Sequence, residues 1–397
     1  MEENDNLNMK MKTKILTSVH IINKRQRNTK RNKIILYNFL SIIFLFLLVL
    51  ILIFILENKK IKNQEKKEKQ ISEVDNNTIN GDNIYISKNL FQYKVEDFSN
   101  TDLKPIHISY SLDNKLIFPT LISMLSGLEN KYKDKNIIIY HLLLSHDFIP
   151  SKVEIFETLK KNYEVKINYY IIPTIFSSLN SWTNGTDCVY YKVLLPIMFP
   201  NLKRIIYLDG DTLIRKDISE MYNYPFGENY ILGFPFYMAY IMDKYEINAT
   251  HYINGGCLLF NIEKIRKDKK DVDLLQFTIK NNSILDFREQ DSINYIFYPN
   301  IGFLPLKYGI YMIGSEKTFK SLSEKTRSPL NLTEGYEAVK DPSIVHFSCC
   351  WPKIWTEGTK NLFNEDKICQ RYQKEFYDYA KKTEYYSEIF NSLFHNS

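Results

Sequence analysis

The segment Arg204-Ile-Ile-Tyr-Leu-Asp-Gly-Asp-Thr212 joins a short apolar strand directly to two carboxylates. Residues two positions apart in an extended backbone point the same way, so Asp209 and Asp211 are predicted to project together from the carboxyl end of this strand. Two such carboxylates can bind a hard divalent cation through oxygen. Gly210 between them lets a phosphate or a sugar approach the backbone closely. The plainer alternative is a strand that ends in an acidic turn.

On either side of this strand, apolar strands alternate with helix-like stretches. Strands are predicted at 106–111, 136–144, 165–172 and 204–208, and helices at 116–128, 152–161 and 190–199. This alternation is typical of an α/β fold whose mostly parallel central sheet carries helices on both faces. Ligands of such sheets bind beyond the carboxyl ends of the strands. The tail, 364–394, has an apolar stripe at helical spacing and predicts a further helix packed on the domain.

Two downstream segments combine glycine or acidic residues with amides. Asn254-Gly255-Gly256 interrupts the apolar strand 252–261, and glycines inside a strand mark either a bulge or the close approach of a ligand to the backbone. Glu289-Gln290-Asp291 opens a helix, where acidic residues also complement the helix dipole. Each segment has a purely structural explanation when it is taken alone.

A fourth segment supplies a histidine and a lysine. The strand Ile344-Val-His346 precedes a proline-bearing loop that contains Lys353 between two tryptophans. A histidine at a strand end can complete a metal site, and a lysine can neutralise phosphate. By itself, His346 is more typical of a buried structural histidine.

Charge and cysteine content exclude several classes of protein. The chain has 397 residues and a net charge of +6, but residues 1–70 hold 15 Lys and Arg against 6 Asp and Glu. The rest holds 37 basic and 40 acidic residues, so a nucleic-acid partner has no electrostatic support. The five cysteines include no Cys-x-x-Cys pair, which excludes a cysteine-based zinc module or a disulfide scaffold.

The amino-terminal region predicts a single-pass membrane protein. Residues 34–56 are almost wholly apolar and long enough to cross the roughly 30 Å hydrocarbon core as a helix. No small-residue cleavage site follows, so an uncleaved anchor is favoured over a signal peptide. Lysines and arginines are balanced on the two sides of this segment, so they do not set its orientation. N-x-S/T triplets favour a lumenal bulk, and they begin at Asn76, Asn184, Asn248, Asn281 and Asn331.

These observations divide the chain into five parts. The predicted parts are a cytoplasmic basic tail (1–33), a transmembrane helix (34–56), a flexible stem (57–104), a catalytic domain (105–360) and a carboxyl-terminal helical extension (361–397). The orientation corresponds to a type II membrane protein, with the catalytic domain in the lumen of the Golgi or the endoplasmic reticulum.

Read together and in this order, the four segments resemble the family 8 glycosyltransferases, the retaining group that includes glycogenin and bacterial lipopolysaccharide galactosyltransferases. The segment Ile108-Ser-Tyr-Ser-Leu-Asp-Asn114 also looks like the family's first strand and uridine-binding turn. The resemblance implies a GT-A (Rossmann-like) nucleotide-sugar-binding fold and transfer of a hexose, glucose or galactose, from a UDP-sugar. The acceptor would be a glycan, glycolipid or glycoprotein.

The resemblance also assigns roles to individual residues. Asp209, Asp211 and His346 would bind Mn²⁺, with Mg²⁺ as a possible substitute. Lys353 would contact the diphosphate, and Asp113 and Asn114 would lie near the uridine. The remaining donor-binding and catalytic positions are Lys192, Gly210, Gly255, Asn254, Glu289 and Gln290.

Two departures from the family pattern concern charged residues. Lys192 stands where the family usually has arginine, which keeps the charge but loses the planar fork. Glu289 stands where aspartate is common. Both changes affect the region of the donor sugar, so the identity of that sugar stays open.

The mechanism and two alternative functions follow from the same residues. Gln290 is a poor nucleophile, which favours front-face attack by the acceptor hydroxyl, with the departing phosphate as base, over double displacement. The main alternative is a membrane-anchored carbohydrate-binding or scaffold protein that kept this fold without catalysis. Leu208-Asp-Gly-Asp-Thr-Leu213 also superficially resembles the nucleophile strand of haloacid-dehalogenase-type phosphatases, but no downstream pair of aspartates accompanies it.

Overall fold

The computed structural model describes residues 92–94, 103–131, 135–179, 187–236, 243–247, 252–310, 332–348, 353–354 and 368–387. All of them lie in the second of two compact units, Val74–Ser397. The predicted basic tail, the predicted transmembrane helix and most of the predicted stem lie outside the described residues. Within the described ranges, none of the helices has the length and apolarity needed to span a membrane.

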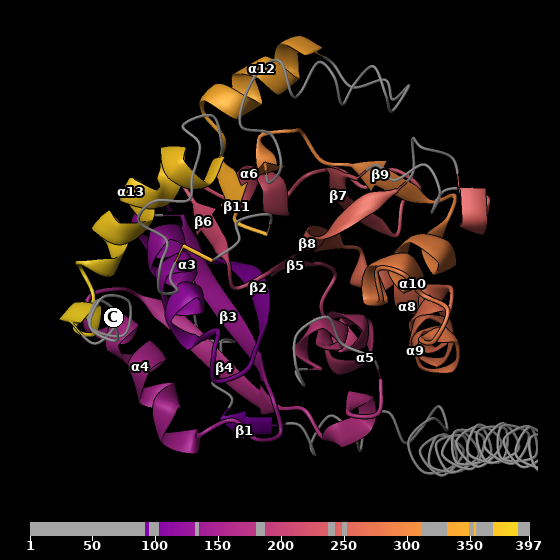
Figure 1. Cartoon of the computed structure of the whole chain (residues 1–397), viewed down its shortest axis with the longest axis horizontal. Helices are drawn as coiled ribbons and strands as arrows, with labels where there is room; N and C mark the ends of the chain where they lie inside the picture. The colour runs from indigo at the N-terminus through magenta and orange to yellow at the C-terminus, as the bar shows by residue number, and fades with distance from the viewer. Residues whose placement is uncertain are drawn as a thin grey trace, which may run out of the picture. The chain divides into compact units, whose positions relative to one another are not determined.

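The described strands form two sheets (Figure 1). The strands are β1 (Gln92–Lys94), β2 (Lys104–Leu112), β3 (Asn136–Leu144), β4 (Val165–Ile171), β5 (Ile205–Leu208), β6 (Thr212–Ile214), β7 (Ile231–Pro235), β8 (Ile253–Phe260), β9 (Ile301–Phe303), β10 (Tyr308–Ile310) and β11 (Ile344–His346). The large sheet has the order β1-β4-β3-β2-β5-β8-β7-β9, and the small sheet has the order β10-β11-β6.

The helices include several short 3₁₀ turns. The α-helices are α3 (Ile117–Glu129), α4 (Val153–Glu157), α5 (Leu195–Met198), α6 (Ser219–Tyr222), α8 (Ile262–Lys267), α9 (Lys270–Asn281), α10 (Glu289–Phe297), α12 (Leu332–Lys340) and α13 (Ile368–Ala380). The 3₁₀ helices are η1 (Pro150–Lys152), η2 (Thr158–Lys161), η3 (Thr174–Phe176) and η4 (Cys188–Leu194).

The central sheet is mostly parallel, as predicted. Among the described strands, β2 pairs in parallel with β3 and β5, β3 with β4, and β7 with β9. The antiparallel pairings are β1 with β4, and β8 with β5 and β7. The long strand β8 therefore joins a parallel half of the sheet to a second half that starts at β7.

Both faces of the parallel half are covered. Tyr110 and Tyr140 lie on the face that packs against α3, where their hydroxyls bond to Ser123 and to the carbonyl of Met124. On the opposite face, the ring of His141 packs against Phe199 after α5. A strand buried on both faces reads as a continuous apolar run rather than as an alternation, which explains the sequence of β3.

The chain passes from the large sheet to the small sheet at the decisive sequence segment. Strand β5 ends at Leu208 in the large sheet, and β6 begins at Thr212 in the small sheet. The residues that make this crossing are 209–211. They lie at the carboxyl end of β5, the edge at which ligands bind in sheets of this kind.

Three predicted elements differ from the structure. The predicted helix 190–199 is a 3₁₀ helix followed by one short α-helical turn, because Pro196 lies at the start of α5 and has no N–H for a preceding α-helical turn. The predicted helix 152–161 is divided in the same way into η1, α4 and η2. The sheet also extends into the predicted stem, because β1 pairs with β4.

The predicted strand interruption at Asn254-Gly255-Gly256 is wrong, since β8 runs through it. The register between β8 and β7 shifts at this place, so the bulge alternative describes the backbone correctly. The predicted carboxyl-terminal helix is present as α13 and buries Tyr372, Phe376 and Ala380.

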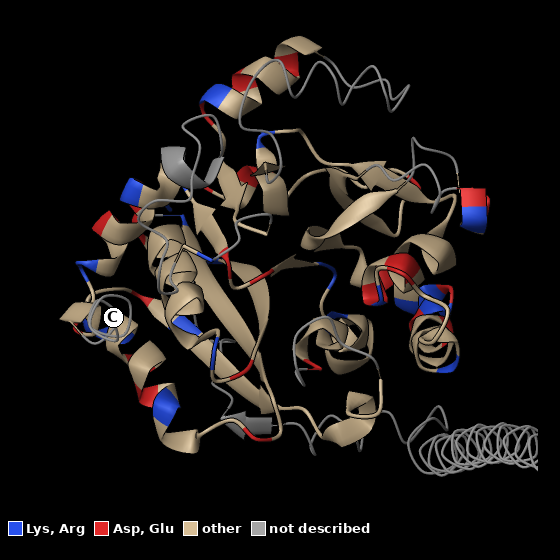
Figure 2. Ribbon diagram, viewed as in Figure 1, with Lys and Arg blue, Asp and Glu red and all other residues tan. Residues whose placement is uncertain are grey.

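Charged side chains are mixed in sign over the outer helices. Figure 2 shows Lys and Arg interspersed with Asp and Glu on α9, α12 and α13, while the central strands carry few charges. Several of these residues pair with each other, as Lys374 does with Asp378 and Lys270 with Asp273. These three helices therefore carry charges of both signs.

Candidate active site

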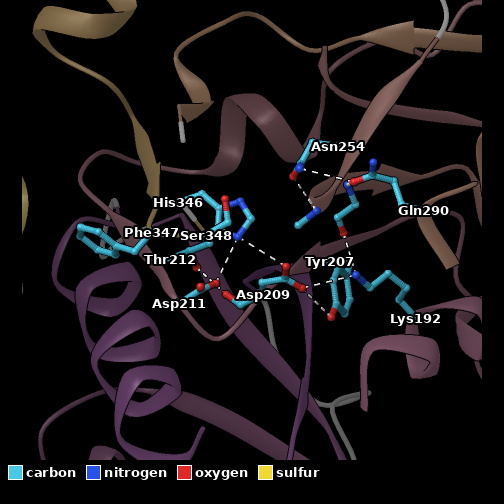
Figure 3. A network of polar contacts seen from close by, with 12 residues as sticks. Lys192, Tyr207, Asp209, Asp211, Thr212, Asn254, Gln290, His346, Phe347 and Ser348 are labelled. Atoms are coloured by element: carbon cyan, nitrogen blue, oxygen red, sulfur yellow. Dashed lines mark hydrogen bonds and ion pairs between the residues drawn. The ribbon is translucent and has the colours of Figure 1, made fainter. Parts of the chain in front are cut away.

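Asp209, Asp211 and His346 converge where the two sheets meet. Strand β11 pairs antiparallel with β6 and sets His346 opposite Thr212, beside the crossing segment. The imidazole Nε2 lies 3.1 Å from Asp211 Oδ1 and 3.4 Å from Asp209 Oδ2 (Figure 3). One ligand atom from each of the three residues lies within 4.8 Å of the others. The sequence segments predicted to share a cation therefore do come together.

Backbone hydrogen bonds fix the two aspartates to separate strands. The Asp209 N–H donates to the carbonyl of Gly256 on β8 at 2.9 Å, and the Phe347 N–H donates to the carbonyl of Asp211 at 2.8 Å. The Thr212 hydroxyl donates to the carbonyl of Asp209 at 3.0 Å. These bonds hold both carboxylates without using the carboxylate oxygens.

Gly256 provides the space in which the cluster forms. A Cβ atom at this position would lie 2.0 Å from His346 Cε1 and 2.6 Å from Asp209 Oδ2. Both distances are far below van der Waals contact, so only glycine fits opposite the imidazole. The second glycine of the pair is less constrained, because a Cβ on Gly255 would be 3.4 Å from Gln290 Cβ.

The electrostatics of the cluster keep both aspartates ionised. Burial raises the pKa of Asp211, but Lys353 and His346 outweigh burial and leave that pKa well below its usual value. Burial likewise opposes ionisation of Asp209, whose pKa is nevertheless lowered by Lys192 and His346. Burial lowers the pKa of His346, while the two aspartates raise it to a net value of about 9.

Two carboxylates and one imidazole are a suitable set of ligands for a divalent cation. Carboxylates suit Mg²⁺ and Mn²⁺, and imidazole is a common ligand of transition metals. Because Gly256 has no side chain, there is room for all three groups to lie close together. At neutral pH the imidazole would have to release a proton before it could act as a ligand.

Lys192 joins this cluster to the segment around Gln290. Its side chain is only 2% exposed, and its Nζ lies 2.9 Å from the Gly255 carbonyl, 3.0 Å from Glu289 Oε1 and 3.4 Å from Asp209 Oδ1. Burial alone would lower its pKa, but Asp209 and Glu289 outweigh burial and raise it. Lys192 is therefore a buried cation that neutralises two carboxylates at once.

The amide of Gln290 lies over β8. Its Oε1 accepts from the Gly255 N–H at 2.8 Å and faces Asn254 Nδ2 at 3.4 Å. Asn254 Oδ1 in turn accepts from the Gly256 N–H at 2.9 Å. Asn254 and Gln290, predicted from separate segments, thus lie together beside Lys192 (Figure 3), and both Gln290 and Lys192 bond to the backbone of Gly255.

Lys353 also contacts the cluster formed by Asp209, Asp211 and His346, through Asp211. Its Nζ is 2.6 Å from Asp211 Oδ2 and also donates to the carbonyls of Phe347 and Ser348. The side chain of Lys353 is 16% exposed. It therefore places an accessible positive charge next to a predicted metal ligand.

Comparison with known proteins identifies the fold and the family. The sequence model described as Glycosyl transferase family 8 matches residues 107–359, which is more than half of the chain. The chain belongs to this family.

Curated relatives of this family 8 chain are distant. General stress protein A of Bacillus subtilis is 27% identical over 195 residues, which are 46% of this chain and 63% of that protein. Lipopolysaccharide 1,3-galactosyltransferase of Salmonella typhimurium is 28% identical over 179 residues, 41% of this chain and 50% of that protein. The chain thus matches about half to two thirds of the length of these relatives.

Solved structures of similar fold include two glycosyltransferases. The galactosyltransferase LgtC, solved with donor and acceptor sugar analogues, has a TM-score of 0.57 and 14% identity, covering 70% of this chain and 96% of that one. The bifunctional glycosyltransferase WbbM has a TM-score of 0.59 and 16% identity, covering 75% of this chain and 53% of that one. These similarities show that the chain has a GT-A-like fold.

Three predicted donor-binding residues make structural contacts. Asp113 Oδ1 accepts the N–H groups of Lys115 and Leu116 before α3, and Asn114 bonds to the loop after β3. Both residues follow the carboxyl end of β2. The space beside Gly210 is filled by Thr120, whose Oγ1 would lie 2.4 Å from a Cβ at that position. Close packing against α3 thus accounts for this glycine.

Sequence reasoning missed three residues that contact the predicted site. The Tyr207 hydroxyl donates to Asp209 Oδ1 at 2.9 Å, and its position two residues before Asp209 on one strand was the available signal. Tyr252 stands in the same relation to Asn254 and contacts Gln290. Asp291 was considered only as a residue that complements the helix dipole, but its carboxylate is buried and fully hydrogen-bonded.

Proposed function

We propose that this glycosyltransferase transfers a hexose from a UDP-sugar, UDP-glucose or UDP-galactose, to a glycan or glycoconjugate acceptor in a Mn²⁺-dependent reaction that retains the anomeric configuration. The observation that carries the proposal is the convergence of Asp209, Asp211 and His346 at the carboxyl end of β5. The family resemblance supports the choice of a nucleotide-sugar donor.

The charges around the cluster suit the departure of a diphosphate. A divalent cation held by Asp209, Asp211 and His346 would supply positive charge to the leaving group. Lys353 adds a cationic group at the exposed side of Asp211. Fixed positive groups that face a developing negative charge lower the barrier because they need little reorganisation during the reaction.

The residues around Gln290 support front-face attack over double displacement. Double displacement requires a carboxylate nucleophile beside the anomeric carbon. Of the two carboxylates that flank Gln290, Glu289 pairs with Lys192, and Asp291 accepts bonds from two tyrosines and two backbone N–H groups. We therefore propose that the departing phosphate accepts the proton of the acceptor hydroxyl while Gln290 shields the back face.

A donor panel tests the proposal. Purified protein is incubated with UDP-glucose, UDP-galactose, UDP-N-acetylglucosamine, UDP-glucuronate or UDP-xylose, and release of UDP is measured with Mn²⁺, with Mg²⁺ and with EDTA. We expect one hexose donor to be turned over, and EDTA to abolish the release.

Variants at the cluster complete this test. Asp209→Asn should lower UDP release by at least about a hundredfold, whereas Asp273→Asn on α9, whose carboxylate pairs with the neighbouring Lys270, should leave it unchanged. Full activity in EDTA would refute the metal role. A folded protein that binds glycans but releases no UDP from any donor would instead favour the non-catalytic scaffold.

We also propose that residues 34–56 anchor the enzyme as a type II membrane protein with its catalytic domain in the Golgi or endoplasmic reticulum lumen. The apolar length of this segment and the N-x-S/T triplets support the proposal. Treatment of the expressed protein with an endoglycosidase should increase its gel mobility. Accessibility of the carboxyl terminus to protease in intact vesicles would contradict this topology.

A further inference from the structure

Tyr252 and Asp291 form a buried chain of hydrogen bonds that ends on the amide of Gln290. The Tyr252 hydroxyl donates to Asp291 Oδ1, and Gln290 Nε2 lies 3.3 Å from the same hydroxyl oxygen. Tyr252 and Asp291 are both fully buried. Neither of them is a proposed metal ligand, so their contact with Gln290 serves a purpose other than metal binding.

The chemistry of the partners fixes the direction of each bond. An ionised carboxylate can only accept, so the Tyr252 hydroxyl must donate to Asp291, and its oxygen is left to accept from the Gln290 NH₂ group. The opposite end of the amide meets the Gly255 N–H, which can only donate and therefore requires the amide oxygen, Oε1, at 2.8 Å. The two contacts require the same orientation of the Gln290 amide, and they restrain its two ends together.

The same chain continues toward the metal cluster. Gln290 Oε1 faces Asn254 Nδ2, and Asn254 Oδ1 accepts from the Gly256 N–H. The Gly256 carbonyl then accepts from the Asp209 N–H. In each of these bonds, from the Asp209 N–H through β8 and Gln290, the donor lies on the side away from Asp291.

The second oxygen of Asp291 holds the carboxylate in place. Asp291 Oδ2 accepts from the backbone N–H groups of Asp286 and Phe287 at 2.8 Å each, and from the Tyr245 hydroxyl at 3.2 Å. These bonds stabilise the turn before α10, in which Arg288 has a φ of 54°. A residue other than glycine at such a φ is strained and is retained only where surrounding contacts fix it.

We infer that Tyr252 and Asp291 are positioning residues for sugar transfer, which hold the Gln290 amide in the single orientation that the reaction uses. This inference rests on the proposed function, because it takes Gln290 to lie beside the donor sugar. It goes further by naming the groups that set the orientation of its amide. The two oxygens of Asp291 have different roles. Oδ1 acts on Gln290 through Tyr252, and Oδ2 supports the turn before α10.

Tyr252→Phe tests the inference with a matched control. The substitution removes only the hydroxyl that bonds to Gln290, whereas Tyr245→Phe removes a hydroxyl from the same carboxylate without touching Gln290. With the donor found in the panel and with Mn²⁺, we expect Tyr252→Phe to lower kcat about tenfold, the loss of roughly one oriented hydrogen bond. KM for the donor should stay within about twofold, and Tyr245→Phe should keep both constants within about twofold.

A double variant separates positioning from general damage to the fold. If Tyr252 acts through Gln290, then Tyr252→Phe should cause no further loss of kcat in a Gln290→Ala background. Equal losses in both backgrounds would overturn the inference, because the hydroxyl would then act independently of the amide. Equal losses of kcat in Tyr252→Phe and Tyr245→Phe would overturn it as well.

Crystal structures give a result that does not require activity. In Tyr252→Phe we expect the Gln290 side chain to rotate or to occupy several conformations, while in Tyr245→Phe it keeps its contact with the Gly255 N–H. An unchanged Gln290 in Tyr252→Phe overturns the inference even if the enzyme is active. Absence of UDP release from every donor by the wild-type protein would refute the proposed function, and the crystal structures would still decide the orientation of the amide.

Discussion

Gly256 determines at the level of single residues whether the cluster can exist. It is the point of β8 that faces both the imidazole and the Asp209 carboxylate. Its backbone carbonyl also accepts the Asp209 N–H. One residue thus provides space on one side and a hydrogen bond on the other.

We predict that Gly256→Ala abolishes metal-dependent UDP release and that Gly255→Ala does so far less. The added methyl group in Gly256→Ala must displace His346 or Asp209, because it would lie 2.0 Å from the ring. In Gly255→Ala the nearest atoms are 3.4 Å or more away. UDP release is measured for each variant, and calorimetric titration with Mn²⁺ gives the two affinities. Similar affinities for the two variants would mean that the contact with the imidazole does not control metal binding.

Some residues of the site were predictable from the sequence and others were not. Asp209 and Asp211 were recognisable because both directly follow an apolar strand, although they lie in the crossing between β5 and β6 rather than along one extended strand. The need for glycine at 256 was not, since it arises from His346, which lies on a strand far away in the sequence. The partners of Lys192 come from three different elements, so their shared contact with one buried cation depends on tertiary packing alone.

At the level of elements, α13 supports the loop that carries the cluster. Phe376 packs edge-on against Phe347, the residue after His346, with ring centroids 5.8 Å apart. The Tyr377 hydroxyl donates to the carbonyl of Ile354, next to Lys353. Arg215 at the end of β6 binds Glu375 through two bonds, at 2.7 and 3.2 Å. The helix thereby holds both β6 and the segment after β11.

We predict that Phe376→Ala weakens Mn²⁺ binding as well as the fold. Removing a fully buried phenylalanine costs about 3–5 kcal/mol of unfolding free energy, and it leaves Phe347 without its ring contact. Lys374→Ala, on the exposed side of the same helix with a side chain 86% exposed, serves as the control. Denaturant unfolding and the Mn²⁺ dependence of UDP release are measured together. A loss of stability with unchanged Mn²⁺ dependence would limit α13 to a structural role.

Elements were predictable where their pattern was local and continuous. The continuous apolar run of β3 predicted a buried strand. The structure shows the strand with the predicted bounds, and all nine of its residues are buried. The 3₁₀ geometry of η4 was not predicted, since the apolar run resembles a helix and only Pro196 signals the change. The crossing from one sheet to the other between β5 and β6 has no local signal, because it depends on the pairing of β6 with β11.

For the molecule as a whole, the buried His107 links stability to pH. Burial lowers the pKa of His107 to about 4, from 6.5 in the unfolded chain. His107 Nδ1 lies 3.0 Å from His141 Nε2 beneath the sheet. Because the unfolded state binds a proton first as the pH falls, the contribution of His107 to stability is present above about pH 6.5 and is lost between there and pH 4.

We predict that acidification from pH 7.5 to pH 5 lowers the unfolding free energy by about 2 kcal/mol through His107. The measurement compares urea unfolding of the wild type and of His107→Gln at both pH values. The wild type should lose about that much more than the variant, which has no titrating group at this position. Equal pH dependence of the two proteins would show that His107 titrates alike in the folded and unfolded states.

The position of the crossing segment has a consequence for the mechanics of the whole domain. Asp209 directly follows β5 of the large sheet, whereas Asp211 directly precedes β6 and His346 ends β11, two neighbouring strands of the small sheet. A cation bound by these three residues would link the two sheets at the point where they meet. Binding and release of the ion would then change how rigidly the two sheets are connected, and not only the positions of the three side chains that bind it.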